Sequence, residues 1–174
     1  MSADFLALAA NRFSVRSFDP RPVDSNALDC ILRAGQLAPT ACNRQPQRVL
    51  VLQSEDALTR LRRCTVCHFN APTVLLICYD STACWTREFD GKSSGDIDAS
   101  IVTTHMMLEA AALGVGSTWV MFFDPAALRR EFSLPDTLIP TAILTLGYPA
   151  SDAAPAPGHT ASRPLDELVF HEHF

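Results

Sequence analysis

The stretch RFSVRSF (residues 12–18) alternates polar and apolar side chains, a pattern that favours an extended segment. Side chains two residues apart share a face of an extended chain, so Arg12, Ser14 and Arg16 are expected to project together. Two guanidinium groups and a hydroxyl on one face suit a dianionic phosphate. A solvated edge strand would carry the same short motif, so the motif alone leaves both interpretations open.

A second informative segment, APTACNRQP (residues 38–46), follows about two dozen residues later. Its two prolines fix a loop between a predicted helix and a predicted strand, and the loop displays Thr40, Asn43 and Gln45. Amide side chains both donate and accept hydrogen bonds, so they suit the edge of a heterocycle with alternating N–H and C=O groups. A loop that merely caps the helix is the alternative interpretation.

Apolar spacing predicts helices and strands on both sides of these segments. Capping residues followed by helical spacing predict helices over residues 4–12, 24–37, 54–63 and 125–132. Apolar runs predict strands over residues 48–52, 73–78, 117–123 and 141–146, and the run TVLLIC at 73–78 indicates a strand covered on both faces.

The longest predicted helix covers residues 96–113 and closes with Gly114 as its C-terminal cap. It is apolar nearly all round, which is typical of a helix buried on every side. In a chain of 174 residues, one of those sides is expected to be a second subunit.

The chain is expected to form one domain, residues 1–174, in which residues 149–174 make an extended C-terminal arm. Four prolines between residues 149 and 164 exclude regular structure there. The apolar side chains that follow indicate an arm that docks on a surface; they are Leu165, Leu168, Val169 and Phe170.

Composition excludes several classes of protein. A net charge of −5 argues against a nucleic-acid partner, which needs a basic surface. The longest apolar stretches are far short of the roughly 20 residues that span a bilayer, so no membrane association is expected. No basic-then-apolar leader is visible, and the six cysteines are expected to be reduced thiols, so the chain is expected to be cytoplasmic.

Several weaker motifs are set aside. The sequence Cys64-Thr65-Val66-Cys67-His68 matches a haem-attachment pattern, but it would need an exported chain. His105 lies inside the long apolar helix and is expected to be an interior histidine. No metal site, Ser-His-Asp arrangement or paired carboxylates can be identified.

Taken in order, RFSVRSF, APTACNRQPQ, the GVGSTWV strand at 114–120 and the late Arg163-Pro164-Leu165 resemble the nitroreductase family of flavoproteins. The resemblance extends from Arg12 to about Phe170, nearly the whole chain. It implies an α+β flavin fold: a central, mostly antiparallel sheet flanked by helices in an intertwined homodimer, with FMN at the subunit interface.

The resemblance also implies a set of FMN-binding residues. The first segment and a late arginine would hold the phosphate and ribityl chain, the 38–46 loop would approach the flavin from the partner subunit, and the strand after the long helix would lay backbone against the isoalloxazine ring. In that order the residues are Arg12, Phe13, Ser14, Arg16 and Arg163; Pro39, Thr40, Asn43 and Gln45; and Trp119, Val120 and Met121. Phe13 departs from the basic or polar residue that the family often has there.

The activity implied is transfer of electrons from NADH or NADPH through FMN to a nitroaromatic, quinone or similar small acceptor by a ping-pong mechanism. Because the cofactor carries the chemistry, no side-chain acid or base is assigned. Two alternatives remain. Relatives with this fold carry out dehalogenation, flavin fragmentation or dehydrogenation, and a flavin or thiol electron-transfer or redox-sensing protein would instead rely on Cys64 and Cys67.

Overall fold

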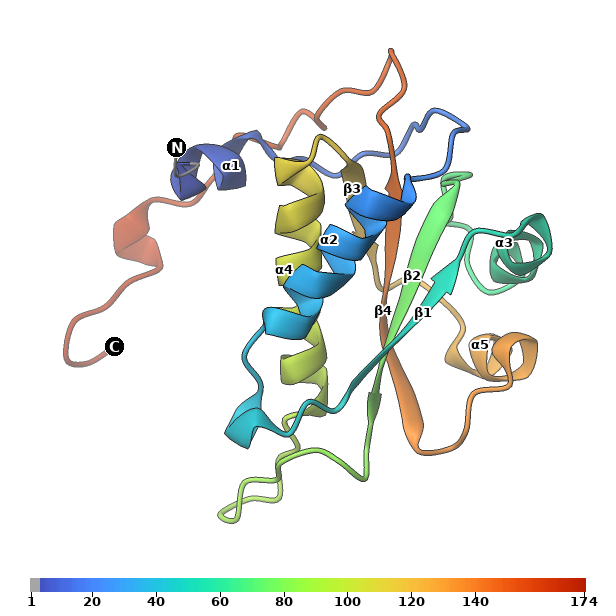
Figure 1. Cartoon of the computed structure of the whole chain (residues 1–174). Coiled ribbons are helices and arrows are strands. Elements are labelled where there is room, and N and C mark those ends of the chain that lie inside the picture. Colours follow the sequence, from blue (N-terminus) through green and yellow to red (C-terminus); the bar gives the residue numbers. More distant parts are fainter. Residues whose placement is uncertain (1–3) are drawn as a thin grey trace.

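The computed structural model describes residues 4–174, which form a four-stranded antiparallel sheet between two layers of helices (Figure 1). The strand order is β1-β2-β4-β3. Helices α2 and α4 cover one face of the sheet, and α3 and α5 cover the other. The elements in chain order are α1 (Phe5–Asn11), α2 (Ser25–Leu37), β1 (Gln47–Leu52), α3 (Glu55–Arg62), β2 (Thr73–Asp80), α4 (Gly95–Ala112), β3 (Gly116–Val120), α5 (Pro125–Phe132) and β4 (Leu138–Gly147).

The central strand β2 contributes to two separate apolar cores. Leu75 and Ile77 pack with α2 and α4, whereas Val74 and Leu76 pack with α3 and α5. All four side chains are fully buried, because successive residues of a strand point to opposite faces. The prediction that this apolar run is covered on both faces is therefore confirmed.

Helix boundaries follow the capping residues of the sequence. Asp4, Asp24, Ser54 and Asp124 each accept hydrogen bonds from backbone N–H groups in the first turn of α1, α2, α3 and α5. The C-terminus of α4 is capped by Gly114, which has a φ of +72°, and Val115 N–H donates to the Ala110 carbonyl. The predicted helices are confirmed to within about two residues.

Two strand predictions were inaccurate. The strand predicted over 117–123 ends at Val120, because the chain must leave the sheet for Asp124 to cap α5, and Met121 is 71% exposed. The strand predicted over 141–146 instead begins at Leu138. The sequence does not predict this extension because it contains Pro140, and proline disfavours a central strand. An irregularity in the pairing beside Ile77 and Cys78 accommodates the proline.

Helix α4 is buried against the sheet and α2 but is open on a third face. Gly35 of α2 lies so close to α4 that a Cβ there would meet Met106 Cγ at 2.8 Å. The open face carries Ile97, which is 50% exposed, and Ile101. The prediction of a helix buried on every side is therefore not met within one chain. None of the helices described between residues 4 and 174 is long and apolar enough to cross a membrane.

Candidate functional site

The extended segment 12–16 lies alongside β3. Val15 N–H donates to the Ser117 carbonyl oxygen at 3.0 Å, and the Thr118 hydroxyl donates to the Val15 carbonyl oxygen. Ser14 and Ser117 pair as a parallel bridge. The structure thus brings together two motifs that are about a hundred residues apart in the sequence.

Local sequence fixes the course of this segment. Helix α1 ends at Asn11 because Arg12 has an extended backbone, with φ −64° and ψ 130°. Val15 is 2% exposed and anchors the segment over the turn between α4 and β3. That close approach requires glycine at position 116, where a Cβ would lie 2.7 Å from Val15 Cγ2.

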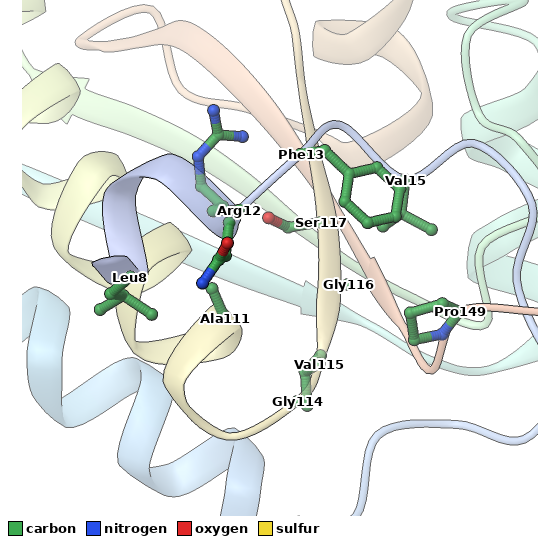
Figure 2. A pocket seen from close by; sticks show the side chains of 11 residues that line it. Leu8, Arg12, Phe13, Val15, Ala111, Gly114, Val115, Gly116, Ser117 and Pro149 are labelled. Carbon is green, nitrogen blue, oxygen red and sulfur yellow. The ribbon is translucent and has the colours of Figure 1, made fainter. Parts of the chain in front are cut away.

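A pocket of about 180 Å³ opens between α1, the α4–β3 turn and Pro149 (Figure 2). Its walls are largely apolar, and Arg12 and Ser117 supply polar groups. Ser117 is 2% exposed, and its hydroxyl has no hydrogen-bond partner among the described residues. A buried hydroxyl without a partner costs about 1–3 kcal/mol, so this position favours a ligand with a polar atom.

The predicted phosphate clamp consists of Arg12, Ser14 and Arg16. The exposed Arg16 guanidinium turns back to donate to the Ser14 carbonyl oxygen at 3.3 Å, which brings these two residues together. Within residues 4–174, neither Arg12 nor Arg16 forms an ion pair with a carboxylate. Both guanidinium groups can therefore bind an anion.

The C-terminal arm returns along the same segment. Ala150 N–H donates to the Ser17 carbonyl oxygen at 3.0 Å, and the Ser17 hydroxyl donates to Asp152 at 2.8 Å. Further on, a His159 ring nitrogen lies 3.1 Å from the Ala10 carbonyl oxygen, and the ring meets Phe13 edge-on. Phe13 is thus a packing residue between the pocket and the arm.

Arg163 lies in the exposed chain four residues beyond His159. Its side chain has no hydrogen bond or ion pair within the described part of the chain. The predicted apolar docking residues also remain exposed within one chain, Leu165 at 74% and Phe170 at 53%. Apart from the short 3-10 turn at Leu165–Glu167, the arm has no helix, and it projects beside α1 (Figure 1).

The 38–46 loop has a strained backbone. Cys42, Asn43 and Gln45 all have φ near +50°, a left-handed conformation that is costly for residues other than glycine. The Thr40 hydroxyl holds the loop from inside by accepting from Gln45 N–H at 3.0 Å. Pro39, Asn43 and Gln45 are exposed. Thr40 therefore has a role in shaping the loop. The Gln45 side-chain N–H donates to the Asn43 carbonyl oxygen at 3.3 Å, which leaves the Gln45 side-chain oxygen and the Asn43 amide available to a ligand.

This loop and the clamp lie at opposite ends of α4. Ala41 is hydrogen-bonded to Asp98 in the first turn of α4, whereas Ala111 in the last turn lines the pocket beside Arg12. Thirteen residues of α-helix span roughly 20 Å. Within one chain the structure therefore does not bring Thr40, Asn43 and Gln45 together with the clamp.

The end of β3 lies against the turn that contains Cys64 and Thr65. The Thr65 hydroxyl donates to the Phe122 carbonyl oxygen, and Asp124 N–H donates to the Cys64 carbonyl oxygen at 2.8 Å. Together the two segments line a pocket of about 410 Å³ with exposed Met121 and Phe122. No local motif indicates this pairing, because it joins residues 57 apart.

The Cys64 thiol has little access to redox chemistry, because it is buried. Burial raises the pKa of the Cys64 thiol, with a further contribution from the nearby Glu131 carboxylate. A raised pKa disfavours the reactive thiolate. Among residues 4–174 no cluster of three or more His, Cys, Asp or Glu side chains is arranged to hold a metal ion.

The segment 12–16 extends the edge of an antiparallel sheet that lies between two helical layers, an arrangement that defines an α+β protein. A crystal structure of a nitroreductase family protein from Clostridium difficile 630 superimposes with a TM-score of 0.92 at 42% identity, covering 98% of this chain and 99% of that one. The sequence model of the Nitroreductase family matches residues 9–73 and 68–148. The chain belongs to the nitroreductase family.

Two further relatives extend the comparison. A structure from Desulfovibrio desulfuricans in complex with FMN has a TM-score of 0.82 and 27% identity, covering 100% of this chain and 99% of that one. A curated protein of Methanothermobacter thermautotrophicus is 27% identical over 161 residues, covering 86% of this chain and 79% of the relative. Its name gives NADH dehydrogenase and NAD(P)H nitroreductase as candidate activities.

Proposed function

We propose that this protein is an FMN-dependent oxidoreductase that passes electrons from NADH or NADPH to a small acceptor such as a nitroaromatic or a quinone. The donor and the acceptor use the site in turn, in a ping-pong mechanism. The observation that carries the proposal is the segment 12–16 docked on β3, whose two arginines form no ion pair within residues 4–174. It occurs in a chain that is 27% identical, over nearly its full length, to a protein solved with FMN.

Arg12 and Ser117 line the pocket, Ser14 and Arg16 lie on the same segment beside it, and together these residues fit a phosphate-bearing flavin. Arg12 and Arg16 lack carboxylate partners, and the buried Ser117 hydroxyl lacks any partner within residues 4–174. Arg12, Ser14 and Arg16 would hold the phosphate, and Arg163 would reach it from the arm. Guanidinium forks match phosphate oxygens in geometry as well as charge.

We propose further that the protein works as a homodimer. Clamp and loop lie roughly 20 Å apart along α4, so a twofold pair would let the clamp of one chain share a flavin with the loop of the other. The open face of α4 supports this arrangement. So do the exposed Phe5 and Leu6 of α1 and the apolar arm, which lie on the same side of the molecule as α4 (Figure 1).

In this arrangement the residues of the protein bind FMN and orient it. Trp119, Val120 and Met121 would lay backbone along the flavin ring as β3 leaves the sheet, and Pro39, Asn43 and Gln45 of the partner's loop would border its polar edge. FMN, when bound, would supply two-electron redox chemistry between the nicotinamide and the acceptor. No side-chain acid or base is assigned, and solvent would supply protons at the open end of the site.

The visible spectrum of the purified protein tests this function. A yellow protein that NADH or NADPH bleaches under anaerobic conditions, and that a nitroaromatic or quinone reoxidises, is the expected result. Bleaching by dithionite alone would point instead to an electron-transfer protein or another donor. A colourless protein that also fails to take up added FMN would refute the proposal.

A further inference from the structure

A buried carboxylate ties the flavin loop to α4. Asp98 lies in the first turn of α4 and is 1% exposed. One of its oxygens accepts from Ala41 N–H at 2.9 Å, and the other accepts from the Ser94 hydroxyl at 2.7 Å. Burying a carboxylate is costly unless its oxygens are hydrogen-bonded, and here both are.

The loop that Asp98 holds stores backbone strain. Cys42, Asn43 and Gln45 adopt left-handed φ values, and such residues persist only where their surroundings impose the conformation. The Thr40 hydroxyl imposes it from within the loop, and the Arg48 guanidinium contacts the Gln45 carbonyl from β1 at 3.2 Å. Asp98 supplies the anchor at the start of the strained turn, directly before Cys42.

The same turn of α4 carries the open apolar face. Ile97 is next to Asp98 in the sequence and is 50% exposed, and Ile101 is one turn further along. The Ser94–Asp98–Ala41 hydrogen bonds therefore link the proposed subunit interface to the loop through buried groups. Because both oxygens of the Asp98 carboxylate are held, this side chain fixes the loop relative to α4 more firmly than an exposed side chain would.

We infer that Asp98 is a positioning residue for FMN: it holds Ala41 N–H so that the 40–45 loop presents Asn43 and Gln45 to the partner subunit's flavin. This inference rests on the proposed function, since it assumes that the loop contacts FMN. Asp98 itself does not touch the cofactor. Losing one of its two bonds releases the strained turn and weakens FMN binding.

The test is the variant Asp98→Asn, because a neutral amide with one acceptor oxygen replaces the charge-assisted bond to Ala41 N–H by a weaker neutral bond, while its N–H group must take over the contact with the Ser94 hydroxyl. The bond that holds the loop loses its charge assistance, so the dissociation constant of FMN is expected to rise about tenfold. FMN fluorescence titration of the apoprotein measures the constant. Hydrogen exchange of the peptide covering residues 38–46 reports the loop itself.

Asp96→Asn is the matched control. Asp96 lies in the same turn and carries the same charge, but it accepts from the Thr141 hydroxyl at 2.9 Å rather than from the loop. Its FMN dissociation constant is expected to stay within about twofold of the parent protein, with unchanged exchange at 38–46. Ser94→Ala, which leaves the Ala41 bond intact, keeps the test valid if Asp98→Asn folds poorly; its effect is expected to have the same direction and a smaller size.

The outcomes distinguish the positioning role of Asp98 from the proposed FMN-dependent function. Weaker FMN binding, faster exchange at 38–46 and a shifted visible spectrum of the bound flavin in Asp98→Asn, but not in Asp96→Asn, support the role of Asp98. Equal FMN affinity with only a lowered melting temperature would assign Asp98 to stability and overturn the inference alone. A parent protein that does not bind FMN would overturn both.

Discussion

Deleting residues 158–174 is expected to weaken both the dimer and FMN binding. The arm makes few contacts within its own chain beyond His159, yet it carries five exposed large apolar side chains, four of them between Leu165 and Phe170. Leu165, Leu168, Val169 and Phe170 are 74%, 58%, 45% and 53% exposed, roughly equivalent to two fully exposed side chains. Apolar surface of this extent is unfavourable in water unless a partner covers it.

The size of the effect follows from these exposures. Burying one large apolar side chain contributes about 1.5–3 kcal/mol, so two side-chain equivalents contribute roughly 3–6 kcal/mol per arm. A symmetric dimer has two arms. If ordering the arms offsets half of the total, roughly 3–6 kcal/mol remains, and the dimer dissociation constant should rise between about a hundredfold and ten-thousandfold.

Sedimentation velocity over a dilution series measures the dimer, and flavin fluorescence measures FMN release. Two narrower variants separate the loss of the proposed phosphate ligand from the loss of apolar contacts between subunits. Arg163→Ala removes the proposed phosphate ligand and keeps the apolar arm, so it should weaken FMN binding and leave the dimer intact; L168S/F170S should weaken the dimer first. If the truncated protein keeps the parent values of both constants, the arm does not dock and Arg163 is not a phosphate ligand.

Three further results are expected. Arg16→Ala should raise the FMN dissociation constant about 30-fold, since the loss of a charge-assisted phosphate pair costs about 2 kcal/mol, whereas Arg33→Ala, at an exposed position of α2, should leave it unchanged; equal affinities in a fluorescence titration would remove Arg16 from the site. Ile97→Asp should yield a folded monomer with little bound flavin, and a dimer unchanged on gel filtration would exclude the open face of α4 from the interface. Burial raises the pKa of Cys78 from 9.0 to about 11, so this thiol should lower the unfolding free energy by up to about 2.7 kcal/mol as pH rises from 9 to 11, and Cys78→Ala should remove that contribution in denaturant titrations.

The sign of that pH effect comes from which state ionises first. The unfolded thiol loses its proton near pH 9, while the folded one keeps it until about pH 11. Between these values ionisation favours the unfolded chain, so the stability present below pH 9 is progressively lost.

The layers of the fold could be predicted from the sequence because their signals are local. Asp24 precedes the apolar spacing of α2, Gly114 follows that of α4, and TVLLIC is a continuous apolar run. Each signal acts within a few residues, so tertiary contacts do not have to be known. The start of β4 was missed because Pro140 normally argues against a strand, and only its pairing partner reveals the irregularity that accommodates it.

The sequence marks the candidate site only where its signals are local. Arg12, Ser14 and Arg16 form a short motif, but its contact with β3 depends on bonds between Val15 and residues 117 and 118. Asp98 was missed altogether. It looks like an ordinary first-turn helix acid until the structure shows its bond to Ala41, 57 positions earlier.

If the flavin site is built from two half-sites, binding of FMN and dimer formation are one linked equilibrium. A ligand that binds only the dimer stabilises the dimer by mass action, and dissociation of the dimer releases the ligand. A lowered FMN affinity in an α4 or arm variant therefore does not show that the altered residue touches FMN. Only the comparison of affinity at several protein concentrations separates a lost contact, which lowers affinity even at saturating dimer, from a weakened interface, whose effect disappears there. The paired variants at positions 163 and 168–170, and at 96 and 98, are informative because they can be compared in this way.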